Sequence, residues 1–413
     1  MKKRNGCSWF AFLLLGIALV MLMVAFLNGS FPQLQLGVIF PWPTQEITTT
    51  QAPPTQPPVT QPAELARAGS FRYHYSQLDE AQQENYRNIL ELMPYFPESV
   101  DVSGIDEEGL RAVFNALLLD QPMLFQISAT HYTIRSDSAT GIPLAFVPLY
   151  RLDRDEYRSR SEELAELVQS IPLPQGGSEF DIQLALHDFL VRNCTYSDDI
   201  EDPEKSTAYG ALVEGSAACM GYSLAMLLML ELNGIDAYVV TGQASNSAGF
   251  SGGHAWNKAR IEGNWYYMDA TWNDPVVEEG GREIVSRAYF NLSEQELGQT
   301  HEITDQNNRA MSTAQNYFRQ TGLFFDRIDR TAEDRIAQEL RRTLDAGDIM
   351  LEIRMSSSQA LAQAVDYLFG RQQQRIYAIL SAVDYGGTRI KTDSVHYSEL
   401  EHLHIIRIYP VMR

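Results

Sequence analysis

The sequence predicts an α+β fold in which a helix that carries a cysteine packs on an antiparallel sheet. Three observations support this prediction. Apolar residues recur at helical spacing directly after Cys219 and end at an Asn-Gly stop signal. Residues 237–241 read as a β-strand and lead into a loop rich in Gly, Ser and Asn. Two alternating aromatic runs, residues 254–261 and 264–272, then flank a Glu-Gly dipeptide and predict a β-hairpin.

The N-terminal segment, residues 1–30, is predicted to form a cytoplasmic tip and a transmembrane anchor. Residues 9–27 carry no charge, and their length suits a membrane span better than a signal-peptide core. Positive residues precede the span, so the N-terminus should stay inside and the folded part should be extracytoplasmic. The expected location is therefore the cell membrane, with a single pass. Cleavage near residues 28–30 is the alternative to this uncleaved anchor.

Two further regions lie between the N-terminal segment and the domain that carries Cys219. Residues 31–66 form a linker rich in Pro, Thr and Gln, which should be extended and semi-rigid. Residues 67–175 begin with helical periods, continue with two strand-like runs and end in a charged helix. We therefore expect an α+β lead-in region that packs on the catalytic domain.

The catalytic domain is predicted over residues 176–320, with a first core helix at residues 181–193. His187 and Asp188 are adjacent in this helix and point in different directions, so they are expected at the surface rather than in a site.

Residues 321–413 are predicted to form a small C-terminal α/β domain. The expected elements in chain order are a helix, a strand, a helix and two further strands: residues 331–345, 348–355, 356–370, 376–385 and 402–410. On the last strand, His402 and His404 would share one face. A strand-edge pair is favoured there over a metal site, which would need a third ligand.

Cys219 is the candidate nucleophile because it lies at the start of a predicted helix. The helix dipole and the free backbone N–H groups favour a thiolate there, and the same groups could stabilise an oxyanion. Gly221 would let a substrate backbone approach the thiol closely. The alternative for an isolated cysteine is a buried structural residue.

The hairpin supplies the candidate base and acid. With Glu262 and Gly263 at the centre of the turn, Trp256 faces Asp269, and His254 and Asp269 become diagonal neighbours on one face of the sheet. Diagonal neighbours lie about 7–8 Å apart at the backbone, within reach of a hydrogen bond between imidazole and carboxylate. A shift of one residue in the register would place the two side chains on opposite faces.

These stretches resemble the transglutaminase-like superfamily, whose members share a papain-like fold. The resemblance runs from about residue 196 to residue 302 and rests on STAYGALVEGSAACMGYS, GGHAWNKARIEGNWYYMDATWNDP and AYFNLSEQEL. It implies Cys219 as the nucleophile, His254 as the base and Asp269 as the orienting acid of a bacterial, membrane-anchored member. The superfamily contains protein cross-linking transamidases, peptidases, amidases and catalytically silent members. One departure is Met220, where bacterial relatives often have a polar residue.

Composition excludes several other classes of function. The formal charge of −21 over 413 residues makes nucleic-acid binding unfavourable. The three cysteines, Cys7, Cys194 and Cys219, provide no disulfide framework, although the last two could in principle pair. No Cys-x-x-Cys or His-Cys spacing indicates zinc, and no cofactor is expected.

The sequence therefore predicts a thiol acyl-transfer enzyme that acts on a protein or peptide substrate, including one at the cell surface. Water as the acyl acceptor would make it a peptidase or amidase, and an amine would make it a transglutaminase. The alternatives are a non-catalytic binding protein on the same fold and a redox thiol protein. The redox alternative is disfavoured because this chain has no resolving cysteine close to Cys219.

Overall fold

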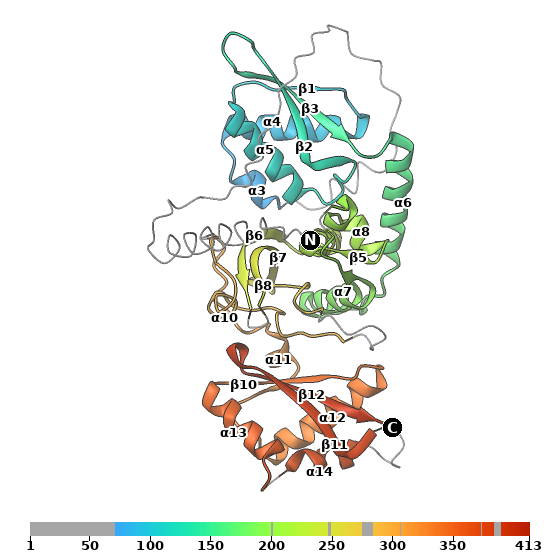
Figure 1. The fold of residues 1–413 in the computed structure, drawn as a ribbon, viewed down its shortest axis with the longest axis vertical. Coiled ribbons are helices and arrows are strands. Elements are labelled where there is room, and N and C mark those ends of the chain that lie inside the picture. Colours follow the sequence, from blue (N-terminus) through green and yellow to red (C-terminus); the bar gives the residue numbers. More distant parts are fainter. Residues whose placement is uncertain are drawn as a thin grey trace, which may run out of the picture. The chain divides into compact units, whose positions relative to one another are not determined.

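The structure, a computed structural model, describes residues 71–199, 201–246, 249–274, 284–305, 307–372, 374–383 and 390–413. It has the predicted α+β architecture (Figure 1). The predicted anchor at residues 1–30 and the linker at residues 31–66 lie outside these described residues. Among the described helices, none is long and apolar enough to cross a membrane.

The lead-in region forms a three-stranded sheet in the order β1-β3-β2, with α5 packed against β3 (Figure 1). Asp79 and Asp106 cap α4 and α5, because their carboxylates accept backbone N–H groups of the first turn. The elements are α3 (Tyr73–Ser76), α4 (Glu80–Leu92), η1 (Met93–Tyr95), β1 (Val100–Asp101), α5 (Glu107–Asp120), β2 (Ile127–Ser136), β3 (Pro143–Tyr150) and α6 (Arg154–Ser170).

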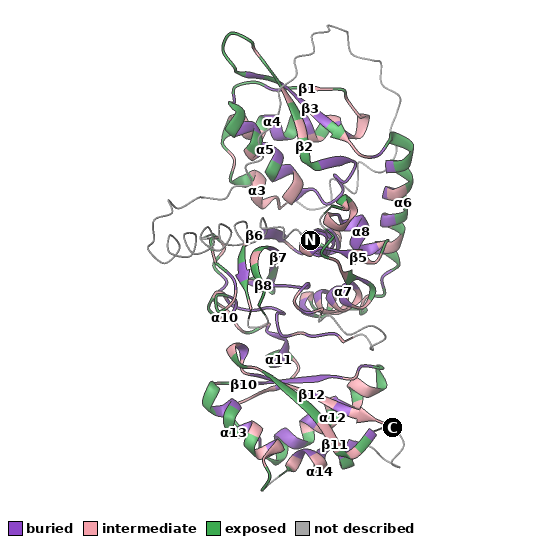
Figure 2. Ribbon diagram, in the orientation of Figure 1, coloured by how far each residue is buried: buried purple, intermediate pink, exposed green. Residues whose placement is uncertain are grey.

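Helix α6 shows how sequence periodicity determines which side of a helix is buried. Its buried residues, Tyr157, Ser161, Leu164 and Val168, recur every three or four positions. Buried and exposed positions therefore alternate along the helix (Figure 2).

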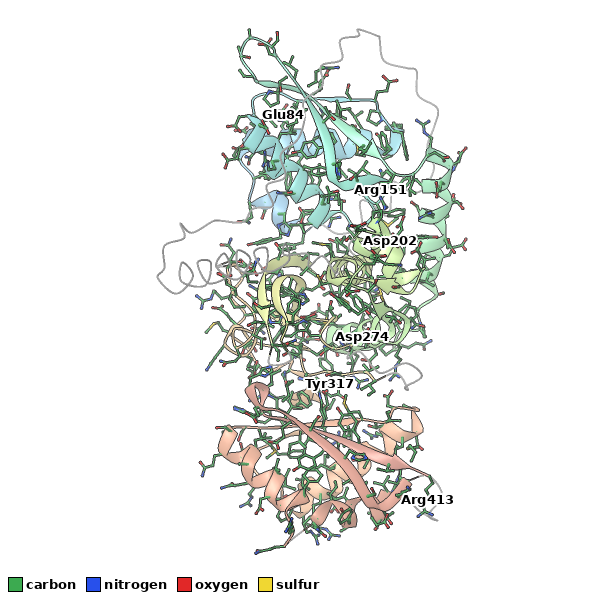
Figure 3. All side chains as sticks on the ribbon, viewed as in Figure 1. Glu84, Arg151, Asp202, Asp274, Tyr317 and Arg413 are labelled. Carbon is green, nitrogen blue, oxygen red and sulfur yellow. The ribbon has the colours of Figure 1, made fainter. Side chains whose placement is uncertain are left out.

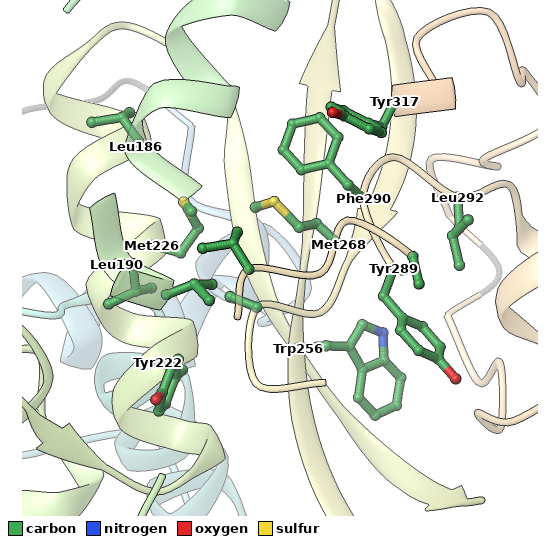
Figure 4. Close-up of a cluster of buried hydrophobic side chains, with 14 of the residues drawn as sticks. Leu186, Leu190, Tyr222, Met226, Trp256, Met268, Tyr289, Phe290, Leu292 and Tyr317 are labelled. Atoms are coloured by element: carbon green, nitrogen blue, oxygen red, sulfur yellow. The ribbon is translucent and has the colours of Figure 1, made fainter. Parts of the chain in front are cut away.

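The central elements position the candidate site. They are α7 (Glu179–Asn193), β4 (Thr195–Tyr196), η2 (Pro203–Ser206), α8 (Ala208–Leu212), β5 (Ser216–Ala217), α9 (Cys219–Leu232), β6 (Ala237–Ser245), β7 (Ser251–Ile261), β8 (Asn264–Met268), α10 (Glu294–Leu297) and α11 (Tyr317–Gln320). Strands β6, β7 and β8 form an antiparallel sheet in that order. Helix α9 packs against β6 and β7 and is apolar on nearly all sides. Figure 4 shows Tyr222 and Met226 within the buried cluster around it.

The hairpin has the predicted register. Asn257 pairs with Met268, and Ile261 pairs with Asn264. Glu262 and Gly263 occupy the turn with φ values of 47° and 79°, as a two-residue turn of type I′ requires.

The C-terminal elements form a sheet in the order β11-β12-β10-β9, in which only β9 and β10 are parallel neighbours. They are β9 (Phe324–Phe325), α12 (Arg330–Asp345), β10 (Leu351–Met355), α13 (Ser358–Phe369), α14 (Arg375–Val383), β11 (Ile390–Leu400), η3 (Glu401–Leu403) and β12 (Ile405–Met412). Helix α11 lies where the chain enters this region. Its first residue, Tyr317, is labelled among the side chains in Figure 3.

Two predictions for this region are wrong. The expected strand at residues 376–385 begins instead as helix α14, because Ile376, Ile379, Leu380 and Val383 recur at helical spacing and are buried on one side. His402 and His404 do not share a strand face. His402 lies in η3 and His404 has a φ of 55°, because the chain turns here between β11 and β12.

The apolar core is continuous between the central and C-terminal elements. One cluster of buried residues contains Met226 on α9 and Ile353 on β10, whereas most buried residues of the lead-in region form a second cluster. A partly buried ion pair adds a polar link. Arg192 on α7 binds both carboxylate oxygens of Asp348, each at 2.7 Å.

Candidate active site

Cys219 is the first residue of α9, and its side chain is partly exposed. The start of the helix is fixed by a hydrogen bond from the N–H of Ala218 to the carbonyl of Lys205, at 2.7 Å. Ala218 is the N-cap and provides no side-chain cap. The N–H groups of the first turn have no partner within the helix, so they are oriented to bind negative charge near the thiol.

Gly221 has a different role from the predicted one. A Cβ atom at this position would lie 2.6 Å from the carbonyl oxygen of Lys205 and 2.7 Å from the Cβ of Ala217. The glycine therefore allows the first turn of α9 to pack against the neighbouring backbone. The close approach is made by this chain itself, not by space left for a substrate.

His254 and Asp269 make the contact that the hairpin register predicts. His254 lies on β7, opposite Gly242 of β6, and Asp269 directly follows β8. The His254 Nε2–H donates a hydrogen bond to Asp269 Oδ2, at 2.8 Å. Both side chains are almost completely buried. Asp269 leaves the ladder of β7, and its own N–H bonds instead to the carbonyl of Tyr289.

The Cys219 side chain lies close enough to the His254 ring to influence its charge, and the same ring bonds to the carboxylate of Asp269. Burial alone lowers the pKa of His254, but attraction to Asp269 and hydrogen bonds to Asp269 and Cys219 raise it to about 10. Burial favours the protonated form of Asp269, and the two histidines that it accepts from outweigh this effect, so its pKa lies well below the usual range. These directions favour an imidazolium–carboxylate pair beside the thiol.

Residues 172–270 match the transglutaminase-like superfamily. This segment is therefore similar to the core domain of that superfamily. It contains α9 packed on the antiparallel strands β6 and β7, in agreement with the α+β papain-like fold that the sequence predicts.

Three solved structures are similar to the chain at low identity. A putative cysteine protease from Cytophaga hutchinsonii is 20% identical over 29% of this chain and 43% of that chain, with a TM-score of 0.22. A TGase is 17% identical over 44% and 52%, with a TM-score of 0.26. The periplasmic domain of TgpA from Pseudomonas aeruginosa, bound to ethylmercury, is 20% identical over 32% and 58%, with a TM-score of 0.19.

The chain thus spans about half of the length of each of these structures. Comparison with curated protein sequences gave no match.

A second histidine, which the sequence did not indicate, also bonds to Asp269. The His301 Nε2–H donates to the same oxygen, Asp269 Oδ2, at 3.1 Å. Asp269 Oδ1 accepts the backbone N–H of Trp272, at 3.0 Å. His301 lies 32 residues after Asp269, outside any regular helix or strand, so spacing along the chain gave no signal for it.

Aromatic side chains border the candidate base. The rings of Trp272 and Phe250 lie 5.4 and 5.8 Å from the ring of His254, measured between centroids. Phe250 is 37% exposed, which is high for a large apolar residue. It therefore offers an apolar surface to a substrate beside His254.

Metal-ligating side chains come together once within the described residues. His254, Asp269 and His301 each offer one ligand atom, and these atoms lie within 4.8 Å of one another. Two imidazoles and a carboxylate are a donor set that zinc accepts. Here both imidazole nitrogens donate protons to one carboxylate oxygen, so hydrogen bonding accounts for the arrangement.

The other candidate groups lie apart from this cluster. Cys194 is free and buried, and burial raises the pKa of its thiol to about 12. The prediction that His187 and Asp188 are surface residues is wrong for His187, which is fully buried. His187 bonds to Asn273 through Nε2, at 3.0 Å, and Asp188 pairs with Arg287. The two residues belong to a structural network on α7.

Proposed function

We propose that the chain is a membrane-anchored, extracytoplasmic thiol acyl-transfer enzyme that uses Cys219, His254 and Asp269 on peptide or carboxamide substrates. The observation that carries this proposal is the position of His254, which hydrogen-bonds to Asp269 and lies near Cys219 at the start of α9. A nucleophile, a base and an orienting acid in this order are the arrangement that acyl transfer requires.

In the first half of the reaction, the Cys219 thiolate attacks the carbonyl carbon of the substrate. The oxyanion that forms lies near the first turn of α9, whose N–H groups can stabilise it. The His254 imidazolium gives its proton to the departing amine or ammonia, and the C–N bond breaks. A thioester on Cys219 and a neutral imidazole remain.

In the second half, water or a primary amine attacks the thioester. His254 takes a proton from this acceptor, the C–S bond breaks, and the thiolate–imidazolium pair is restored. Throughout, Asp269 holds the Nε2–H of His254, so Nδ1 remains the atom that exchanges protons at the reacting centre. Water gives a peptidase or amidase, and an amine gives a transglutaminase.

The test uses the full chain in detergent micelles. Iodoacetamide should alkylate Cys219 faster than Cys194 at pH 7, because Cys219 is partly exposed beside the proposed base, whereas Cys194 is buried and burial raises the pKa of its thiol. His254→Ala should slow the alkylation of Cys219. Equal rates for the two cysteines in the wild-type chain would contradict the proposed chemistry.

A second assay separates the two acceptors. The chain is incubated with a glutamine-containing protein and a biotinylated primary amine, and both amine incorporation and peptide cleavage are measured. Incorporation supports the transglutaminase and cleavage supports the peptidase, while Cys219→Ser should abolish either activity and Cys194→Ser should abolish neither.

The anchoring part of the proposal rests on the uncharged run at residues 9–27 behind Lys2, Lys3 and Arg4. A protease added outside intact cells should release the part of the chain that follows the Pro-rich linker. Complete protection until the cells are lysed would reverse the proposed orientation.

A further inference from the structure

Both oxygens of the Asp269 carboxylate accept hydrogen bonds. Oδ1 accepts the N–H of Trp272, while Oδ2 accepts one imidazole N–H from His254 and another from His301. A carboxylate is only an acceptor, so both imidazoles must donate through Nε2. The rotation of this carboxylate is therefore defined by three hydrogen bonds, and one of these comes from a histidine outside the expected triad.

Backbone pairing brings His301 to this position. His301 forms an isolated antiparallel bridge with Ala244, and Thr300 and Glu302 bond to the backbone of β6 on either side. Gly242, two residues earlier on β6, lies opposite His254. Residues 300–302 thus extend the edge of the sheet that carries the candidate base.

The His301 ring is held tightly once it is there. Its side chain has no exposed area. Nδ1 lies 2.9 Å from Thr300 Oγ1, which can donate its proton to it. The rings of Trp272, Trp256 and Tyr289 surround it at centroid distances of 4.5, 4.8 and 6.0 Å. Figure 4 shows Trp256 and Tyr289 among the buried side chains of this region.

We propose that His301 is a positioning residue of the same site, which holds the Asp269 carboxylate in the orientation that His254 requires. This inference rests on the proposed function. His301 does not touch the thiol or a substrate. It acts through Asp269, because loss of its hydrogen bond would let the carboxylate rotate and weaken its hold on the Nε2–H of His254.

The experiment compares two amides of different reach in the full chain. His301→Gln places an amide N–H near the position of Nε2, so it can still donate to Asp269 Oδ2. His301→Asn is equally polar but one methylene shorter, and its amide cannot reach that oxygen. Iodoacetamide alkylation of Cys219 at pH 7, followed by mass spectrometry of the Cys219 peptide, reports on both variants without any knowledge of the substrate.

We expect alkylation to slow about ten-fold in His301→Asn, the size that corresponds to one hydrogen bond to a charged group. His301→Gln should stay within about two-fold of the wild-type rate. His131→Gln, at a histidine on β2 of the lead-in region, should leave the alkylation rate unchanged, because this strand contributes no residue to the site. Equal rates in the Asn and Gln variants would overturn the inference.

The design also separates this inference from the proposed function. If wild-type Cys219 reacts no faster than Cys194, the thiol chemistry itself fails. If wild-type Cys219 reacts fast and His301→Asn reacts equally fast, only the role of His301 fails. If His301→Asn does not fold, Thr300→Val gives the decisive result, because it removes the hydroxyl at Nδ1 and leaves the ring among its aromatic neighbours. Slower alkylation then supports the inference, and the wild-type rate overturns it.

Discussion

At the scale of single residues, the site depends on how burial and charge compete at His254. Burial disfavours a cation there, and the neighbouring Asp269 carboxylate reverses this preference, so the pKa of His254 is raised to about 10. The pKa of His254 in the folded state exceeds the ordinary value of about 6.5. The His254–Asp269 pair therefore contributes its full stabilisation below about pH 6.5. This contribution is lost as the pH rises towards 10.

Asp269→Asn tests this competition. An amide carries no charge to offset burial, so the pKa of His254 should fall to or below its ordinary range, and His254 should be neutral at pH 7. An NMR titration of histidine-labelled protein should show the His254 signal shifting near pH 10 in the wild type and several pH units lower in the variant. Alkylation of Cys219 at pH 7 should slow in parallel. Unchanged titration would mean that Asp269 does not set the charge of His254.

Gly221→Ala tests the packing of the first turn of α9. The added methyl group would lie 2.6 Å from the Lys205 carbonyl oxygen, so the turn that carries Cys219 must move. We expect a loss of about 1–3 kcal/mol in the free energy of unfolding, as for other overpacked sites, together with slower alkylation of Cys219. Gly252→Ala is the control, since its Cβ would meet nothing closer than Phe250, at 3.9 Å. Urea unfolding of both variants gives the comparison.

At the scale of elements, the β7–β8 hairpin sets the geometry of the site. Its turn fixes which residues face one another, and a shift of one residue would move His254 and Asp269 to opposite faces. The contact at 2.8 Å therefore depends on a turn several residues away. The geometry of the candidate site therefore depends on the register of the hairpin as well as on the identity of its residues.

Gly263→Ala probes the turn directly. Gly263 has a φ of 79°, which a residue with a Cβ adopts only with strain, so the substitution should destabilise the chain by about 1 kcal/mol. Gly253→Ala serves as the control, because a Cβ there would meet no atom within 4 Å and the backbone is not left-handed. The urea midpoint of Gly263→Ala should be lower than that of Gly253→Ala. A Gly263→Ala variant as stable as the control would show that the turn does not specify the register.

The sequence predicted these elements well where the pattern was local. The hairpin register, the start of α9 at Cys219 and the helices α4, α5 and α6 all follow from periodicity and turn residues. Residues 376–385 were assigned to a strand because a short apolar run does not distinguish a strand from a buried helix.

The contacts that the sequence could not give are those between distant segments. His301 reaches Asp269 from a segment that pairs with β6, and Gly221 on α9 meets the backbone of Lys205 on η2. His187 is buried because α7 is covered by the segment that contains Asn273. Each of these contacts depends on tertiary packing, which produces no periodic pattern of residues in the sequence.

At the scale of the whole molecule, the C-terminal sheet supports the segment that follows Asp269. Glu352 on β10 accepts hydrogen bonds from Ser286 Oγ at 2.7 Å, from the N–H of Arg287 at 2.8 Å and from Arg407 Nε at 2.9 Å. His402, in the turn before β12, lies 2.8 Å from the hydroxyl of Tyr289. Tyr289 in turn accepts the backbone N–H of Asp269, so C-terminal residues reach the candidate acid through one intermediate.

Glu352→Ala should therefore affect both stability and the site. The change leaves the partly buried Arg407 without its carboxylate partner, which destabilises the fold, although by less than the loss of a partner in a fully buried pair. We expect a lower urea midpoint and slower alkylation of Cys219. Asp334→Ala removes an exposed carboxylate paired with Arg330 and should change neither quantity measurably. A Glu352→Ala variant that matched this control would show that the C-terminal sheet does not support the site.

The unequal burial of the two described cysteines makes the chain suitable for optical measurements. Once Cys7 is replaced by serine, a thiol-reactive fluorophore at neutral pH should attach at Cys219 alone, since Cys194 is buried and its pKa is raised to about 12. Trp272 lies 5.4 Å from the ring of His254, the neighbour of Cys219, so its indole can quench the emission of the dye by electron transfer. Candidate ligands that displace the dye from this indole should brighten the sample, so a binding partner can be sought by fluorescence before any reaction is known.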